Sequence, residues 1–368
     1  MRIIQVIGSM GTGGAEKLLL DTIPLYCANG LTMDLAVFWD NNSPFAEKLK
    51  GLACNKIYIL NQSATGKDIY KLSNIRKLAA IIKDYDIVHV HLFPALYFVA
   101  IALFLVKGKK PKLVFTEHST TNKRMTSAFF SKIDKFIYSK YDKIVCITEE
   151  IKGKLKQIYR IKDAGLKVIQ NGVNIDKIKK ATPLSLVNLT GNNADTVKVC
   201  IMQVAAFRKG KDQKTVIRAL QHLPGDFHLF FVGDGEYRLE CEQLSIELGL
   251  ASRVHFLGQR MDVPELIKGA DILVLSTEFE GLSLASIEAM ASGNPFIASD
   301  VPGVTGLVKD YGILFPLGDE RRLAAEIMHL STDPEYKREV IRKCIERAGD
   351  FDIKNMIHEH ITLYEELV

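Results

Sequence analysis

Two glutamates, Glu280 and Glu288, are spaced so that they could bind two separate parts of one elongated polar ligand. The apolar run Asp271–Leu275 that precedes them is typical of a buried strand. The stretch Ser283–Ala291 has helical composition and is soon followed by glycine and proline, which end helices. The sequence therefore predicts a strand, a tight turn that holds Glu280, and a helix that holds Glu288. Eight residues of helix rise by roughly 12 Å, which would separate the two carboxylates.

The predicted turn is suited to bind an anion. Gly281 lets the backbone come close to a ligand because it has no Cβ atom. The first free N–H groups of the helix, from about Leu282 to Ala285, would point into the same crevice and suit a diphosphate. The alternative interpretation is that both carboxylates are ordinary solvated side chains. The residues of this stretch leave both interpretations open.

The length and composition indicate a globular protein of two domains. A chain of 368 residues is too long for one typical domain. The apolar share of 47% is enough for two buried cores. The six cysteines lack the paired spacing of metal or redox sites, so we expect reduced thiols in a cytoplasmic protein. The N-terminus, Met1–Ile7, has the pattern of a buried strand rather than of a signal peptide.

The charge is uneven along the chain, although the net charge is only +5. Residues 1–174 carry 26 Lys and Arg against 14 Asp and Glu, a net charge of +12, and the remainder is acidic. A basic half favours an anionic partner surface. Nucleic acid is one such partner. The anionic leaflet of a membrane is another, since each basic group close to it contributes about 1 kcal/mol. A chance imbalance on a solvated face is the third interpretation.

Short apolar runs alternate with helical segments along the whole chain. This alternation predicts an α/β architecture with parallel sheets covered by helices on both faces. The predicted strands of the first half are Ile3–Ile7, Asp34–Phe38, Lys56–Leu60, Ile87–Val90, Leu113–Thr116, Lys143–Ile147 and Lys167–Gln170. Those of the second half are Lys198–Val204, His228–Val232, Val254–Leu257, Ile272–Leu275, Pro295–Ala298 and Ile313–Phe315.

The stretch around the two glutamates resembles the signature of the family 4 retaining glycosyltransferases of GT-B fold. Gly-Leu-Ser follows Glu280, and Ala-Met-Ala-Ser-Gly-x-Pro follows Glu288. The resemblance implies two Rossmann-like, doubly wound parallel-sheet domains that face a central cleft. It implies an acceptor-side domain at 1–174, a nucleotide-sugar donor-binding domain at 175–350, and a C-terminal helix at 351–368 that crosses back to the first domain.

The resemblance also implies a role for each residue of the stretch. Glu280 is expected to contact hydroxyls of the donor sugar, which makes it a catalytic as well as a donor-binding candidate. Glu288 is expected to bind the ribose of the nucleotide. The backbone after Gly281, at Leu282 and Ser283, is expected to hold the diphosphate.

Three segments of the first half match the same family. The glycine-rich turn Gly8–Glu16 resembles the loop that lies against the donor phosphate or the acceptor, with Gly13 and Gly14 as its candidates. His118 stands at the carboxyl end of a predicted strand, where parallel sheets bind ligands. It matches the family's histidine beside the donor sugar and phosphate, and is the second catalytic candidate. Asn171 lies in the segment that resembles the end of the first domain.

A cationic loop, Val204–Asp212, lies near the start of the second domain. It resembles the family loop whose arginine and lysine hold the donor diphosphate, and Lys211 matches well. The usual Gly-Arg pair is replaced by Ala205 and Ala206, so Arg208 is the alternative cation. Which cation occupies the site stays open.

We expect no metal ion, and no cofactor apart from the nucleotide diphosphate sugar as donor substrate. Arg208, Lys211 and the helix N-terminus can compensate the charge of a departing diphosphate. Two Asp-x-Asp sequences, at 84–86 and 350–352, mimic the metal-binding acids of the other glycosyltransferase fold. We interpret both as chance.

Four other segments carry structural predictions. The apolar run 92–106 is shorter than the ~20 residues that span a bilayer and is expected to be a buried helix. Residues 127–140 mix aromatic residues with lysines at helical spacing, which fits a helix at a membrane interface or a core helix with a basic outer face. Polar residues at 174–196 indicate a linker. Beyond Asp319 we expect two helical segments, the last at Ile353–Leu367.

The expected function is transfer of a sugar, with retention of configuration, from a UDP-sugar or another nucleotide sugar to a surface-glycan, saccharide or polyprenyl-linked acceptor. The expected place is the cytoplasm, peripheral on the inner face of the plasma membrane through an anionic surface contact of the N-terminal domain. Two alternatives remain: a nucleotide-sugar epimerase of the same fold, and a non-catalytic protein that binds glycans or nucleic acid. We expect no nucleic acid partner, because the acid pair and the cationic loop are both present.

Overall fold

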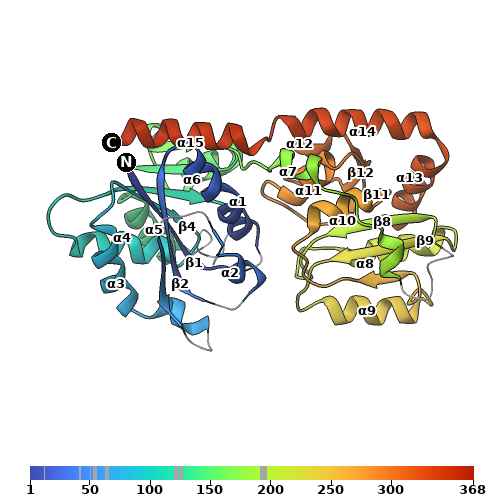
Figure 1. Ribbon diagram of the computed structural model, residues 1–368, viewed down its shortest axis with the longest axis horizontal. Coiled ribbons are helices and arrows are strands. Elements are labelled where there is room, and N and C mark those ends of the chain that lie inside the picture. The colour runs from blue at the N-terminus through green and yellow to red at the C-terminus, as the bar shows by residue number, and fades with distance from the viewer. Residues whose placement is uncertain are drawn as a thin grey trace. The chain divides into compact units, whose positions relative to one another are not determined.

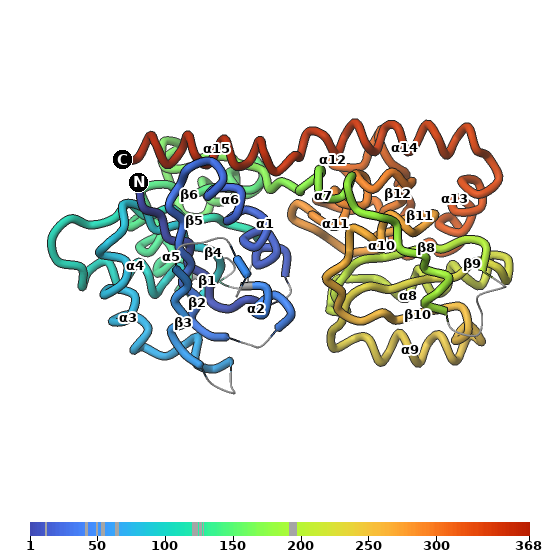
Figure 2. The backbone as a smooth tube through the Cα atoms, in the orientation of Figure 1, coloured from blue at the N-terminus to red at the C-terminus, as the bar shows by residue number. Residues whose placement is uncertain are grey.

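The computed structural model describes residues 1–11, 13–40, 43–49, 51–52, 56–62, 66–119, 124, 127–190 and 197–368. They form two units: unit 1 comprises Met1–Gly172 and Ile353–Val368, and unit 2 comprises Val173–Asp352. The sequence predicted these boundaries at 174 and 350. Figure 2 traces the path, with the chain entering unit 2 in green and returning to unit 1 as the red C-terminal helix. The two ends of unit 2 are neighbours, because Val173 and Asp352 form a parallel bridge.

Unit 1 is built on seven parallel strands in the order β3-β2-β1-β4-β5-β6-β7. The order reverses between β1 and β4, and doubly wound sheets bind ligands at such a point. Every strand predicted in the first half of the chain is confirmed. The strands are β1 (Arg2–Ser9), β2 (Thr32–Trp39), β3 (Ile57–Asn61), β4 (Ile87–His91), β5 (Lys112–Glu117), β6 (Lys143–Cys146) and β7 (Leu166–Val168).

Unit 2 repeats the plan with six parallel strands in the order β10-β9-β8-β11-β12-β13. Here the order reverses between β8 and β11. The cationic loop follows β8 and the Glu280 turn, residues 276–281, follows β11, so both arrive at the reversal point. The strands, again all predicted, are β8 (Val199–Val204), β9 (Phe227–Val232), β10 (Val254–Phe256), β11 (Ile272–Leu275), β12 (Phe296–Ser299) and β13 (Ile313–Phe315).

The strands are near-continuous apolar runs because helices cover parallel sheets. Every residue of β4 and of β9 is buried. Figure 1 shows the helices around each sheet. Those of unit 1 are α1 (Gly14–Ala28), α2 (Pro44–Leu49), η1 (Gly66–Tyr70), α3 (Ser73–Ile82), α4 (Ala95–Leu105), α5 (Ala128–Tyr138), α6 (Glu149–Tyr159), η2 (Asp163–Gly165) and α15 (Ile353–Leu367). Those of unit 2 are α7 (Ile175–Lys180), η3 (Leu186–Leu189), α8 (Gln213–Ala219), η5 (Leu220–His222), α9 (Arg238–Glu247), α10 (Val263–Gly269), α11 (Leu284–Ala291), α12 (Thr305–Val308), α13 (Glu320–Thr332) and α14 (Pro334–Gly349). The predicted α/β class with two parallel sheets is confirmed.

The prediction of a linker at 174–196 is wrong for most of its length. Residues 175–180 and 186–189 form α7 and η3, and Ile175, Ile178 and Leu186 are buried in the core of unit 2. A few apolar residues among many polar ones are enough to anchor the segment. Residues 191–196 lie outside the described residues.

The prediction of a buried helix at 92–106 is only half right. The helix is α4, which buries Leu96 and Val99 but exposes Ile101, Phe104 and Leu105. A helix that is apolar on all sides has no polar face, so its sequence does not indicate which residues are exposed. Within the described ranges, no helix combines the length and the apolar character needed to cross a membrane.

The two helical segments expected beyond Asp319 are three helices, α13, α14 and α15. Asp333 separates the first two. Its carboxylate accepts hydrogen bonds from the amides of Glu335 and Tyr336 over 3.0 and 2.9 Å, which starts α14.

Candidate active site

In unit 2, hydrogen bonds fasten the cationic loop to the Glu280 turn. Lys211 and Thr277 form an antiparallel bridge between the two segments. The amide of Asp212 donates to the carbonyl oxygen of Ser276 over 3.1 Å, and the Ser276 hydroxyl donates to the Asp212 carboxylate over 2.8 Å. The Thr277 hydroxyl donates to the carbonyl oxygen of Gly210 over 2.8 Å. These contacts fix the register between the loop and the turn.

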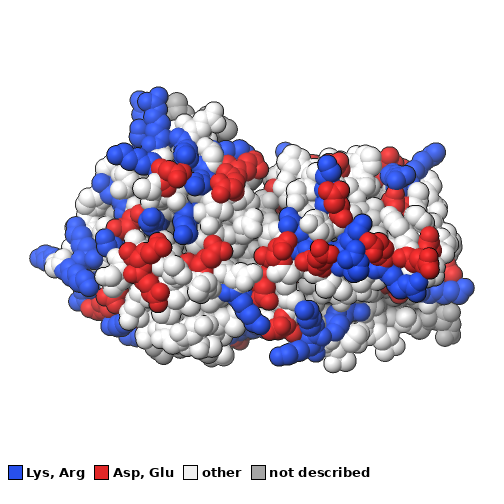
Figure 3. Space-filling view, turned by 90° about the horizontal axis from the view of Figure 1, so that it is seen from above, with Lys and Arg blue, Asp and Glu red and all other residues white. Residues whose placement is uncertain are grey.

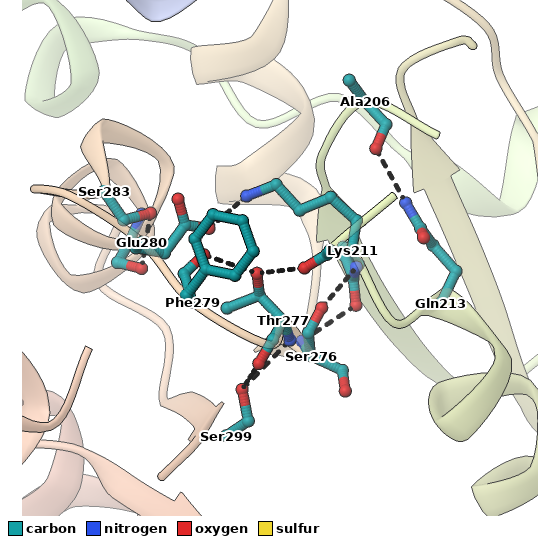
Figure 4. A network of polar contacts seen from close by, with 12 residues as sticks. Ala206, Lys211, Gln213, Ser276, Thr277, Phe279, Glu280, Ser283 and Ser299 are labelled. Carbon is teal, nitrogen blue, oxygen red and sulfur yellow. Dashed lines mark hydrogen bonds and ion pairs between the residues drawn. The ribbon is translucent and has the colours of Figure 1, made fainter. Parts of the chain in front are cut away.

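This register places Lys211 against Glu280, two residues that the resemblance assigns to the donor. Nζ of Lys211 contacts Oε1 of Glu280, and the two side chains are only 12% and 13% exposed. Figure 4 shows them pointing toward one another, with the ring of Phe279 beside them. A largely buried charge needs its partner. A ligand that carries an anionic group and hydroxyls can replace this ion pair, with its anionic group bound to Lys211 and its hydroxyls donating hydrogen bonds to Glu280.

Two residues that sequence reasoning missed hold the Glu280 turn in place. Oγ of Ser299 donates to the carbonyl oxygen of Thr277 over 2.7 Å and accepts from the Thr277 amide over 3.0 Å. Gly303 has a φ of +82°, and a Cβ atom there would lie 2.0 Å from the carbonyl oxygen of Glu280. Only glycine fits this position without moving the turn. The Pro-Gly pair at 302–303 is the signal that could have identified it.

The helix after the turn, α11, begins where the sequence predicts. Ser283 is its N-cap, since its Oγ accepts from the amide of Ser286 over 3.3 Å. The Ser283 hydroxyl is therefore engaged within the helix, and Gly281 and Leu282 are half-buried ahead of it. Glu288 is buried within α11, and Glu280 is largely buried as well. This burial excludes the interpretation of both acids as ordinary solvated side chains.

The two candidate cations differ in their surroundings. Lys211 reaches Glu280, whereas the side chain of Arg208 is exposed on the same loop. At the place of the usual Gly-Arg pair, the carbonyl oxygen of Ala206 accepts from Nε2 of Gln213 over 3.1 Å. The backbone there is held in place, and the cation next to the acid is Lys211.

In unit 1, His118 follows β5 directly and lies against His91, the last residue of β4. Nε2 of His118 is 3.2 Å from Nδ1 of His91. Burial, with a smaller contribution from His360, lowers the pKa of His118 to about 4. His118 is therefore a neutral imidazole at neutral pH.

The other unit 1 candidates lie at the start of α1 and close to the boundary with unit 2. Gly13 is the N-cap of α1 and Gly14 is its first residue. A Cβ atom at Gly13 would lie 2.5 Å from Oε2 of Glu16, so this carboxylate covers the glycine turn. Asn171 is buried. The structure thus brings Lys211, Glu280 and the start of α11 together within unit 2, and holds the remaining candidates in unit 1.

The two Asp-x-Asp sequences have structural contacts of their own. The carboxylate of Asp86 accepts from the amide of Arg2 over 2.9 Å, and Asp350 pairs with Arg347 over 2.8 Å. In the part of the chain that the structure describes, no three His, Cys, Asp or Glu side chains are grouped closely enough to hold a metal ion.

Two family models match consecutive parts of the chain. The model described as Glycosyltransferase Family 4 matches residues 12–177, and the model described as Glycosyl transferases group 1 matches residues 190–347. The first covers most of unit 1 and the second most of unit 2, including the cationic loop and both glutamates.

Two curated relatives are similar to most of the chain. The UDP-Gal:alpha-D-GlcNAc-diphosphoundecaprenol alpha-1,3-galactosyltransferase of Escherichia coli is 26% identical over 331 residues, which cover 86% of this chain and 82% of that protein. The N-acetyl-alpha-D-glucosaminyl L-malate synthase of Bacillus anthracis is 25% identical over 312 residues, 81% of this chain and 80% of that protein.

The fold has solved counterparts. The crystal structure of Anabaena Alr3699/HepE in complex with UDP and glucose superimposes with a TM-score of 0.84 at 22% identity, over 99% of each chain. That identity supports a shared fold rather than a shared substrate. The sheets, the site of unit 2 and the family models agree: the chain belongs to the family 4 glycosyltransferases of GT-B fold.

Proposed function

We propose that this glycosyltransferase moves a hexose from a UDP-sugar to a saccharide acceptor, either a polyprenyl-linked saccharide or a growing surface glycan. The observation that carries the proposal is the Lys211–Glu280 pair at the start of α11. Lys211 and the amides of α11 suit a diphosphate, and Glu280 suits the sugar hydroxyls. Glu288 would accept from the ribose hydroxyls. The E. coli relative uses a UDP-sugar and an undecaprenol-linked acceptor by its name, and the Anabaena protein holds UDP.

The proposed reaction retains the configuration of the sugar. The bond between the anomeric carbon and the diphosphate oxygen breaks while the acceptor oxygen bonds to the same face of that carbon. The acceptor proton passes to the departing phosphate oxygen, so no protein nucleophile is required. Lys211, the amides of α11 and the exposed Arg208 stabilise the negative charge that leaves. The proposal therefore includes neither a metal ion nor a further cofactor.

In unit 1 we assign His118 and Asn171 to the sugar being transferred, and the Gly13–Gly14 turn to the acceptor. The carboxylate of Glu16 beside Gly13 would repel a phosphate but can accept hydrogen bonds from hydroxyls. This argues for acceptor hydroxyls rather than donor phosphate at the turn.

Calorimetry with UDP and GDP is the first test, followed by mass spectrometry of UDP-sugars with the acceptor omitted and then supplied. We expect UDP to bind, slow hydrolysis of one UDP-sugar, and transfer once a lipid-linked saccharide is present. Glu288→Ala should weaken UDP binding, whereas Glu280→Ala and His118→Ala should reduce turnover more than UDP affinity. An isomerised nucleotide sugar from donor alone would favour the epimerase. If no nucleotide binds, and RNA or DNA binds in a salt-sensitive way, the non-catalytic alternative is favoured.

We also propose that the protein works on the anionic inner face of the plasma membrane, docked through an aromatic face of unit 1. This face consists of Phe104 from α4 and Phe129, Phe130 and Phe136 from α5, all exposed. The rings of Phe104 and Phe136 stack with centroids 6.5 Å apart, and Nζ of Lys140 lies 4.3 Å from the Phe136 centroid. Figure 3 shows one face of the molecule, on which Lys and Arg are interspersed with Asp and Glu.

The chemistry of this face fits an anionic bilayer better than water. Phenylalanine rings gain roughly 2 kcal/mol each on full burial in an apolar medium. Lys132 and Lys135 on α5, and Lys107 and Lys110 after α4, are exposed and add positive charge to the same two segments of the chain. Lipid phosphates attract such groups. The exposed rings on α5 are the observation that supports our choice of the membrane-interface interpretation of residues 127–140.

Co-sedimentation with vesicles tests the docking. Phe129 and Phe136 are 70% and 52% exposed, so their replacement by Ser should leave the fold intact. We expect Phe129→Ser/Phe136→Ser to reduce binding to phosphatidylglycerol vesicles at least roughly tenfold. Leu239→Ser is the matched control, because Leu239 is 76% exposed on α9 of unit 2. Equal binding of both variants, or equal binding to neutral phosphatidylcholine vesicles, would exclude this face as the docking site.

A further inference from the structure

A continuous chain of hydrogen-bonding groups stands behind His118, and the reaction proposed above does not use it. Nε2 of His118 is 3.2 Å from Nδ1 of His91, and Nε2 of His91 is 2.7 Å from Oε1 of Gln5. The amide nitrogen of Gln5 is 3.4 Å from Sδ of Met33 and 3.4 Å from the hydroxyl of Tyr364. His91, Gln5, Met33 and Tyr364 are all buried, so water does not compete for these contacts.

The direction of each hydrogen bond follows from the Met33 end of the chain. A thioether sulfur cannot donate, so the NH2 group of Gln5 faces Met33 and its Oε1 faces His91. An amide oxygen only accepts, which places the proton of His91 on Nε2. A neutral imidazole carries one such proton, so Nδ1 of His91 has a lone pair. Burial lowers the pKa of His91 well below its usual value, which keeps the ring neutral. The partner on this lone pair must donate, and that partner is Nε2–H of His118.

A second chain, through Tyr364, is consistent with this direction. The Tyr364 hydroxyl accepts from Gln5 and therefore donates its own proton to Nδ1 of His89, 2.6 Å away. His89 then carries its proton on Nε2, which lies 2.7 Å from Oγ1 of Thr116. The donors of Gln5, His89, His91, His118 and Tyr364 in the two chains each face an acceptor.

We propose that Gln5 and His91 are positioning residues that hold His118 in the tautomer with its proton on Nε2 and a bare Nδ1. No residue in the described ranges forms a hydrogen bond with Nδ1 of His118, so this nitrogen is the group that His118 offers to a ligand. It can accept from a sugar hydroxyl, but it cannot donate to a phosphate oxygen. His118 therefore accepts a hydrogen bond from a hydroxyl of the sugar. The identity of the ligand rests on the proposed function, whereas the tautomer does not.

Long-range ¹H–¹⁵N NMR of the ligand-free, ¹⁵N-histidine-labelled full-length protein tests the tautomer without any need for turnover. The His118 signals, identified by their loss in His118→Gln, should show a protonated Nε2 and an unprotonated Nδ1. His91→Leu removes the acceptor and should give averaged signals from both tautomers. His91→Asn keeps an acceptor oxygen close to the place of Nδ1 and should restore the parent pattern. Thr116→Val breaks only the His89 contact and is the matched control, with the parent pattern expected.

Kinetics then separate positioning from folding. His91→Leu and Gln5→Leu should lower kcat roughly fivefold with little change in UDP-sugar KM, the effect of one lost neutral hydrogen bond, and His91→Asn should recover most of it. Far-UV circular dichroism establishes that each variant is folded. A parent His118 with its proton on Nδ1, or a His91→Leu variant with the parent NMR pattern, would overturn the proposal even if sugar transfer is observed. Absence of sugar transfer together with the expected NMR pattern would contradict only the proposed function.

Discussion

Acidification should destabilise unit 1 through His360. This side chain is 5% exposed in α15, and its ring lies 5.4 Å from the ring of His89 and 6.0 Å from that of Tyr364. Burial lowers the pKa of His360 to about 4, partly offset by its bond to the carbonyl oxygen of Met356. The unfolded chain, with a histidine pKa of about 6.5, takes up the proton first when the pH falls. The stabilisation is therefore complete above pH 6.5 and is lost between pH 6.5 and 4.

The magnitude follows from the two pKa values. At pH 5 the unfolded histidine is almost fully protonated and the folded one is mostly neutral, which costs about 2 kcal/mol relative to pH 7.5. We expect the free energy of unfolding of His360→Phe, which keeps an aromatic ring, to fall between pH 7.5 and pH 5 by about 2 kcal/mol less than that of the parent. The carboxylates that titrate in the same range are common to both proteins and cancel in the comparison.

Tryptophan fluorescence in urea is the assay. The chain has one tryptophan, Trp39 in β2, so its emission reports the unfolding of unit 1. His358→Phe is the matched control, because His358 is exposed on the same helix, and its pH dependence should equal that of the parent. If His360→Phe and the parent lose the same free energy of unfolding between pH 7.5 and 5, the reasoning about His360 is wrong.

Three further predictions concern unit 2. Gly303→Ala should weaken UDP binding in calorimetry by roughly tenfold or more, because its Cβ atom would displace the Glu280 turn. Gly318→Ala is the control, because Gly318 has a similar left-handed φ of +78° but nothing lies within 4 Å of an added Cβ atom. This variant should cost only about 1 kcal/mol of stability. Equal UDP affinities for the two variants would contradict the geometry. Lys211→Met should lower the stability of unit 2 by roughly 2 kcal/mol, because Glu280 loses its cation. The double variant Lys211→Met/Glu280→Gln should recover the stability but not the UDP affinity. If the stability does not recover, the charge pair is not the cause of the loss. Ser283→Ala should cost about 1 kcal/mol in urea unfolding followed by circular dichroism, as a lost N-cap does; an unchanged midpoint would mean that the cap contributes nothing.

The sequence predicts the strands well because of the way parallel sheets are buried. A strand such as β9 is covered on both faces and is therefore apolar along its whole length, which a run of letters shows directly. The exposure of α4 could not be predicted, since Phe104 and Val99 look alike in an apolar run although one is exposed and the other buried. What decides between them is the neighbouring helix, which the sequence does not specify.

The candidate site was proposed mainly from the resemblance to the family. Glu280, Lys211 and His118 are charged or titratable residues whose neighbours in the sequence match the family's motifs. The residues that hold the Glu280 turn, such as Ser299 and Gly303, act through a hydroxyl or through the lack of a Cβ atom. Their residue type does not indicate which part of the chain they contact. The pair His89-Val-His91 did carry a signal, because alternate residues of a strand share one face. Its partners on α15, more than 260 residues away, could not be found from spacing.

The bridge between Val173 and Asp352 makes unit 2 an insertion whose two ends meet at one place, held also by the hydrogen bond from the Val173 amide to the carbonyl oxygen of Phe351 over 2.9 Å. A segment with adjoining ends can be exchanged by cutting the gene at two codons, after Gly172 and before Ile353, without reconnecting any strand of the flanking sheet. Chimaeras that graft this segment from a relative with a different nucleotide preference would change the donor while the recipient scaffold, including its returning helix, stays covalently intact.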